Sequence, residues 1–143
     1  MPRGKPILVP VDGSACSDRA VRAAIDLVGR GVGDRLHLLN VQPDFGGVVA
    51  TFVPRAQIET YHREEGEKAL ASAVAIAKEA GVRAETHIGV GRHGPTVRDF
   101  VASLGIGMVM MGTRGHTGLA GVLLGSVAQD VVAHVDVPVC LVK

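Results

Sequence analysis

The sequence has few aromatic residues and almost no net charge, and each shortage excludes a class of partner. Of 143 residues none is Trp, and the aromatic share is 3%. The chain therefore lacks the stacking platforms on which single-stranded nucleic acids are usually bound. Its formal net charge of +1 produces no field that would draw it to DNA or to an anionic membrane. We expect neither nucleic acid nor a membrane among its partners.

Cysteine and long apolar runs are also scarce. Only Cys16 and Cys140 are present, whereas a secreted domain of this size often carries several paired cysteines, so a reducing compartment is favoured. The first apolar run, Ile7 to Val11, is too short for the core of a signal peptide. No stretch approaches the roughly 18 apolar residues of a transmembrane helix. We expect a cytoplasmic protein, with Cys140 in the core of its last strand.

Apolar runs and helical stripes alternate along the chain and predict one domain spanning residues 1–143. Strands are expected at 7–11, 35–42, 82–90, 108–111 and 137–142. Helices are expected after the first strand, with Ser14 or Ser17 as the N-cap, and at 56–80, 95–104 and 126–135. This alternation predicts the α/β class, with a doubly wound five-stranded parallel sheet covered by helices on both faces. The segment 43–54 is rich in Gly and Val and is expected to be a long loop. In the helix at 56–80, we expect Tyr61 and Val74 to face inward together with Leu70 and Ala77.

Two polar, glycine-bearing segments follow strands of this predicted sheet. Asp12-Gly13-Ser14 follows the first strand, and residues 112–126 connect the fourth strand to the last helix. In open parallel sheets, ligands bind beyond the carboxyl ends of the strands, where the strand order reverses. If the first and fourth strands are neighbours, both segments face one crevice.

The segment 112–126 has the properties of a phosphate-binding loop. Glycines allow the backbone to approach a ligand closely. The amino end of the following helix supplies N–H groups and partial positive charge. Ser126 adds a hydroxyl donor, and Arg114 adds a positive charge.

The spacing in this loop resembles that of the ATP-binding branch of the universal stress protein family. That branch carries Gly-x2-Gly-x9-Gly-Ser/Thr after its fourth strand, and this chain has Gly112, Gly115 and Gly125-Ser126 at those positions. The segments 10–14 and 137–139 also look like the first and last strands of the family. The resemblance covers nearly the whole chain. It implies the adenine nucleotide alpha hydrolase-like fold with strand order 3-2-1-4-5, and ATP with Mg²⁺ or Mn²⁺ as the ligands.

The resemblance also implies a role for individual residues. Asp12 would contact either the ribose or the metal ion. In the second case, Asp12 and the ATP phosphates would hold the ion together. The residues expected on the base and sugar side are Pro10 and Val11 through their backbone, Val41, Met111 and Gly112. The residues expected around the phosphates are Gly115, Gly125, Ser126 and Val127, with Arg114 beside them. The family further implies a homodimer, formed through the last strand at Val137–Val142.

Because no convincing general base is apparent, the chain is interpreted as a nucleotide-dependent switch or sensor of the stress response. A downstream protein of unknown identity would recognise the bound state. Two alternatives stay open: a slow ATPase or nucleotidyl-transferring enzyme of the same fold, and a dimeric stress module that binds no nucleotide. Measured turnover of ATP would distinguish an enzyme from a switch. Extraction of bound small molecules from the purified protein would distinguish a nucleotide-binding switch from a module that binds no nucleotide.

Other motifs carry less weight. The segment Gly89–Gly94 matches G-x-G-x-x-G, but no acidic residue follows about 20 positions later, as a dinucleotide-binding fingerprint requires. No Walker A motif is present. None of the six histidines pairs with a cysteine at zinc-finger spacing, and His37, His62, His87 and His134 are expected to be structural.

Overall fold

The computed structural model describes residues 4–114 and 124–143. Five parallel strands form one sheet with the order β3-β2-β1-β4-β5, which confirms the expected fold class and strand order. The strands are β1 (Ile7–Pro10), β2 (Leu36–Gln42), β3 (Ala84–Val90), β4 (Met108–Gly112) and β5 (Val139–Val142). Because β1 lies between β2 and β4, the strand order reverses beside β1.

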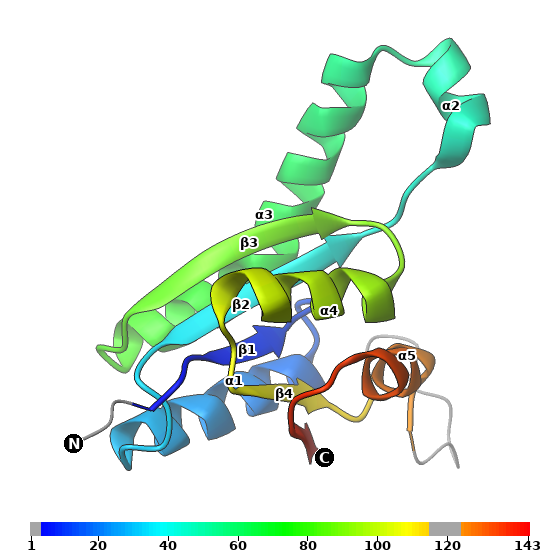
Figure 1. Ribbon diagram of the computed structural model, residues 1–143. Helices are drawn as coiled ribbons and strands as arrows, with labels where there is room; N and C mark the ends of the chain where they lie inside the picture. Colours follow the sequence, from blue (N-terminus) through cyan, green and yellow to red (C-terminus); the bar gives the residue numbers. More distant parts are fainter. Residues whose placement is uncertain (1–3, 115–123) are drawn as a thin grey trace.

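Four helices cover the two faces of the sheet (Figure 1). Helices α1 (Ala15–Gly29) and α3 (Arg55–Glu79) cover one face, and α4 (His93–Leu104) and α5 (Ser126–His134) cover the other. The alternation of β1 shows this division, because Val9 is buried in the cluster with α1 and α3, whereas Leu8 is buried in the cluster with α4 and α5. The buried runs of the central strands thus follow from coverage on both faces.

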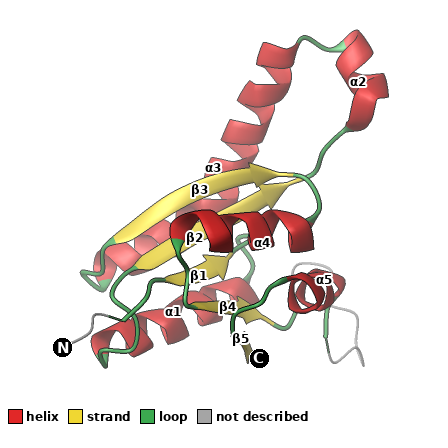
Figure 2. Cartoon of the chain, viewed as in Figure 1, coloured by secondary structure: helices red, strands yellow, loops and turns green. Residues whose placement is uncertain are grey.

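A further helix, α2 (Gly46–Phe52), lies in the segment that we expected to be a long loop. Together with the first turns of α3 it projects beyond the sheet (Figure 2). None of its residues is buried, and the Phe52 side chain is 81% exposed. We call α2 and the first turns of α3 the projecting arm. At the base of this arm, the ring centroid of Phe45 lies 5.5 Å from that of Tyr61 and 5.1 Å from that of His62.

The inward face of α3 differs from the expectation. Leu70 and Ala77 are buried as expected, but Tyr61 and Val74 are exposed. The buried stripe of α3 consists of His62, Gly66, Leu70, Ala73 and Ala77. Tyr61 and Val74 lie beside this stripe and not on it.

The last strand is an edge strand, and this corrects the expectation for Cys140. β5 pairs with β4 alone among the described strands. Cys140 and Leu141 are exposed, whereas Cys16 is buried at the start of α1. In the described part of the chain, no helix is long and apolar enough to span a membrane.

Candidate functional site

The end of β1 is held in place by side chains from β2. The amide Nδ2 of Asn40 donates to the Val11 carbonyl over 2.8 Å, and the amide Nε2 of Gln42 donates to Oδ1 of Asn40 over 2.6 Å. The Val11 N–H donates to the Leu39 carbonyl. The backbone therefore leaves β1 in a fixed direction at the point where the strand order reverses.

Asp12 forms a tight turn between β1 and α1. Its Oδ1 accepts a hydrogen bond from the Ser14 N–H over 2.9 Å. Gly13 adopts φ 82°, a conformation that favours glycine. Ser14 then caps α1 by accepting from the Ser17 N–H, as one of the two candidate caps predicted. This turn fixes Asp12, which is partly exposed, at the carboxyl edge of the sheet.

The end of β4 meets the start of α5 at the same edge. The Gly125 N–H donates to the Thr113 carbonyl over 2.6 Å, and the Thr113 N–H donates to the Val142 carbonyl. Gly125 is the N-cap of α5 and has no side chain to occupy the N–H groups of the first turn. Ser126 and Val127 follow as exposed first-turn residues. An uncapped helix start with exposed N–H groups is a site that attracts anions.

Two of the motif glycines have a packing role in this structure. A Cβ added at Gly112 would lie 2.7 Å from Cys16 Sγ and 3.1 Å from the Cys16 backbone. A Cβ added at Gly125 would lie 3.1 Å from the Thr113 carbonyl oxygen. Gly112 thus allows β4 to lie close to α1, and Gly125 allows α5 to lie close to the end of β4. The three elements therefore meet at the carboxyl edge of the sheet. The third glycine of the motif, Gly115, lies outside the described residues.

The remaining predicted residues lie at this edge on different faces of the sheet. Val41 and Met111 are buried in the cluster beneath α4 and α5. Val11 is buried in the opposite cluster, so only its backbone can reach a ligand beside Val41. Pro10 ends β1, and Arg114 is exposed directly after Thr113.

A polar cluster between α4 and α5 was not predicted from the sequence. Asp130 accepts from Arg92 Nη2 over 2.8 Å and from the Gly94 N–H over 2.7 Å. The Gly94 N–H, more than any other contact, lowers the pKa of Asp130. His134 Nδ1 donates to the Asp130 carbonyl over 2.7 Å. The pairing depends on how two helices pack, which residue spacing does not reveal.

His93, the first residue of α4, completes this cluster. Burial lowers the pKa of His93, while the charges of Asp130 and Asp12 oppose that shift. Because the pKa of His93 is lowered overall, its imidazole is neutral at neutral pH. His93 therefore brings a proton acceptor into the electrostatic range of Asp12.

The glycines of the segment 89–94 are explained by packing. A Cβ at Gly89 would lie 2.7 Å from Thr96 Cγ2, and a Cβ at Gly94 would collide with the His134 ring and lie 2.5 Å from the Asp130 carbonyl oxygen. Both glycines allow α4 to lie close to its neighbours. Gly91, between them, adopts φ 139°, a conformation that favours glycine, so each glycine of the G-x-G-x-x-G match has a local structural reason.

Comparison with models of known protein families identifies the family of this chain. The family model described as "Universal stress protein family" matches residues 4–143. The chain belongs to the universal stress protein family. Its relatives include universal stress protein MJ0531 of Methanocaldococcus jannaschii, 33% identical over 97% of this chain and 82% of the relative. Universal stress protein YxiE of Bacillus subtilis is 32% identical over 96% of this chain and 97% of the relative.

A solved universal stress protein has the same fold with a ligand bound. The structure of the Archaeoglobus fulgidus universal stress protein in complex with dAMP is 26% identical to this chain. It superposes with a TM-score of 0.70 and covers 99% of each chain. Within the universal stress protein fold, the carboxyl edge described above is thus the place to seek a ligand.

Proposed function

We propose that this universal stress protein binds ATP at the carboxyl edge of its sheet and acts as a nucleotide-dependent switch in the cytoplasmic stress response. The observation that carries the proposal is the junction of β4 and α5, where Gly125 leaves the first turn of α5 without a side-chain cap, at the same edge of the sheet as Asp12. The dAMP complex of the Archaeoglobus fulgidus relative supports an adenine nucleotide as the ligand.

Each part of the nucleotide has a partner in this proposal. The phosphates lie against the N–H groups of Ser126 and Val127, with Gly115 and Arg114 beside them. The adenine packs on the strand ends at Val41 and Met111, and its edge is recognised by backbone groups near Pro10 and Val11. The ribose lies by Asp12 and Gly112. Aliphatic packing with backbone recognition suits a chain with 3% aromatic residues.

The Asp12 carboxylate fits a Mg²⁺ or Mn²⁺ ion carried by the phosphates. Mg²⁺ is commonly held by one or two carboxylates together with substrate phosphates and water. Asp12 supplies one such carboxylate, and its turn with Ser14 fixes the position of that group. When bound, the ion would neutralise phosphate charge.

Slow ATP hydrolysis is the second candidate. Burial lowers the pKa of His93, at the start of α4, against the charges of Asp130 and Asp12, and a neutral imidazole can accept a proton from an attacking water. A switch and a slow ATPase differ in turnover. Repeated turnover of ATP that disappears in His93→Gln would favour the enzyme, whereas unchanged nucleotide over hours would favour the switch.

Dimer formation through β5 is part of the proposal. β5 is an edge strand, and unpaired edges favour pairing with another chain. Exposed Leu141 adds apolar surface at this edge. The partner that recognises the bound state is a further protein of unknown identity.

The first experiment identifies the ligand. Small molecules released from the denatured purified protein are analysed by mass spectrometry, and the apo protein is then titrated with ATP and Mg²⁺ by calorimetry. ATP at 100 times its dissociation constant should stabilise the fold by about 2.7 kcal/mol. An extract without nucleotide, together with a melting temperature that ATP does not change, would favour the module that binds no nucleotide.

A second experiment removes one backbone donor. Ser126 is the first helical residue of α5, where proline is well tolerated, and Gly125 has the extended conformation (ψ 161°) that precedes proline. Ser126→Pro deletes the N–H and should weaken ATP binding about tenfold or more, because hydrogen bonds to charged groups contribute about 1.5–3 kcal/mol. Ser126→Ala keeps the N–H and is the control. Equal affinity in both variants would exclude this N–H as a phosphate ligand.

A further inference from the structure

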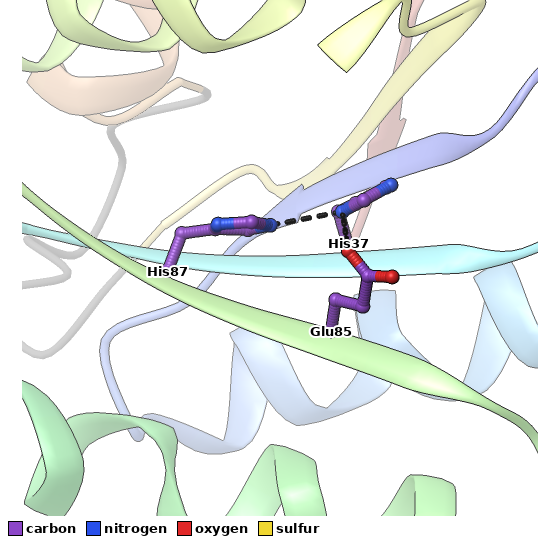
Figure 3. A group of neighbouring side chains, drawn as sticks. All are labelled: His37, Glu85 and His87. Atoms are coloured by element: carbon purple, nitrogen blue, oxygen red, sulfur yellow. Dashed lines mark hydrogen bonds and ion pairs between the residues drawn. The ribbon is translucent and has the colours of Figure 1, made fainter.

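Two histidines and a glutamate face one another across β2 and β3 (Figure 3). His37 of β2 is the register partner of Glu85 in β3, and His87 follows two residues after Glu85 on the same face. Nδ1 of His37 lies 2.9 Å from Nε2 of His87 and 3.6 Å from Oε2 of Glu85. The three potential ligand atoms lie within 4.8 Å of one another.

These separations are close to those of a metal coordination sphere. Zn²⁺ binds imidazole nitrogen at about 2.0–2.1 Å and carboxylate oxygen at about 2.0–2.2 Å, which places tetrahedral ligands about 3.3 Å apart. The distances of 2.9 and 3.6 Å lie on either side of that value. The third pair, Glu85 with His87, lies within 4.8 Å, so the side chains would have to rotate to bring all three atoms to that separation.

The donor set selects the class of metal. Two imidazoles and one carboxylate suit Zn²⁺ and similar divalent transition metals, whereas Mg²⁺ and Ca²⁺ prefer oxygen ligands. Three protein ligands leave one position of a tetrahedron for water. The Glu85 side chain is 43% exposed, so the cluster has a side open to solvent.

The surroundings of His37 favour the neutral form of its imidazole. Burial and, after it, the neighbouring His87 lower the pKa of His37, and Arg35 acts in the same direction against Glu85 and Asp34. A neutral imidazole is the form that binds metal. In the metal-free pair one of the two facing ring nitrogens carries a proton and the other accepts it. Binding of a metal ion to both nitrogens requires that proton to move to the other nitrogen of the same ring, so both imidazoles stay neutral. The Phe100 ring, 5.6 Å from that of His87, packs against it from α4.

We propose that His37, Glu85 and His87 form a binding site for a divalent transition metal of the Zn²⁺ type. The site lies near the amino ends of β2 and β3. Along β2, His37 precedes Val41 of the nucleotide edge by four positions, about 13 Å in an extended strand. His87 is the register partner of Leu39, two positions before Val41, so the two sites have no residue in common. The metal cross-links the edge strand β3 to β2, and the two neutral imidazoles and one carboxylate leave the complex with one positive charge.

The test uses the full chain without an affinity tag, because a histidine tag would itself bind Zn²⁺. Apo protein is titrated with Zn²⁺ by calorimetry in the absence of nucleotide, and with Co²⁺ by visible absorption, which reports the coordination number. We expect one ion per chain. Glu85→Gln and His87→Gln should each weaken Zn²⁺ binding more than about 100-fold, since even outer-shell partners of metal ligands contribute about 10–100-fold.

Matched controls keep the test specific. Glu64→Gln, on the exposed side of α3, and His62→Gln, at the base of the projecting arm, should bind Zn²⁺ as the unchanged protein does. Circular dichroism checks that each variant is folded. All four variants should keep the ATP affinity of the unchanged protein, so failure of the nucleotide proposal would leave this result untouched. Absence of a one-to-one Zn²⁺ complex, or full affinity in folded His87→Gln, would overturn the metal site.

Discussion

The carboxylate of Asp130 in α5 accepts a hydrogen bond from the Gly94 N–H in the first turn of α4, over 2.7 Å. The same carboxylate accepts from Arg92 Nη2. A negative charge at the amino end of a helix is stabilising, and here it comes from another helix. This contact fixes α4 and α5 relative to each other beside the carboxyl edge, so the shape of the proposed nucleotide site depends on it.

Asp130→Asn should lower the free energy of unfolding at pH 7 by about 1–2 kcal/mol, because hydrogen bonds to a charged acceptor are stronger than those to a neutral one. The lowered pKa of Asp130 sets the pH dependence. Its stabilisation is complete above the pKa of the unfolded chain, near 3.8, and is lost as the pH falls through the lower folded value. Urea unfolding should therefore separate the two proteins at pH 7 and less so towards pH 3. Asp99→Asn, at an exposed aspartate of α4, is the control, and an equal loss there would contradict a specific role for Asp130.

Gly94→Ala should destabilise the fold by about 1–3 kcal/mol, because the added methyl group would overlap the backbone of Asp130 and the His134 ring. Gly29→Ala, at the end of α1, is the matched comparison, since nothing lies within 4 Å of its added Cβ. That substitution should instead stabilise the fold by about 0.5–1 kcal/mol. Urea unfolding of both variants measures the two effects, and a neutral Gly94→Ala would show that α4 can move away without cost.

Ser126→Asp should change stability and nucleotide affinity in opposite directions. A carboxylate in the first turn of α5 interacts favourably with the helix dipole and should stabilise the apo protein by about 0.3–1 kcal/mol. The same charge repels the phosphates and should weaken ATP binding about tenfold or more. Thermal unfolding and calorimetry measure the two effects, with Ser126→Asn as the uncharged control. Unchanged ATP affinity in Ser126→Asp would place the phosphates elsewhere.

The sheet was predictable from the sequence because its central strands are continuous apolar runs bounded by glycine and polar turns. Helix α2 was missed for a physical reason: it begins with two glycines, which are poor helix formers, and it has only seven residues, none of them buried. Cys140 was placed in the core because a strand of apolar residues looks the same at the edge and in the centre of a sheet. Only the strand order shows that β5 has a neighbour on one side.

The candidate site was predictable in part. The strand ends at Asp12 and Gly112 were identified because turn residues follow buried runs, and β1 lies beside β4 as expected. The contact of Asp130 with Gly94 and the pairing of His37 with Glu85 depend on helix packing and on strand register. Residues 36 and 48 positions apart in the sequence carry no local pattern that would reveal such contacts.

Leu141→Arg should convert the proposed dimer into a monomer. In the single chain Leu141 is 39% exposed on the edge strand β5. Pairing of two chains through this strand would bury Leu141. An arginine at this position would then carry a buried charge without water around it. Val90→Arg is the matched control, because Val90 is 47% exposed at the end of the opposite edge strand, β3. Light scattering after size-exclusion chromatography should give a dimer for the unchanged protein and for Val90→Arg. Cys140, exposed in the single chain, should react with a thiol reagent more slowly in the dimer than in Leu141→Arg. A monomer at high protein concentration, or a dimer that survives Leu141→Arg, would rule out this edge as the interface.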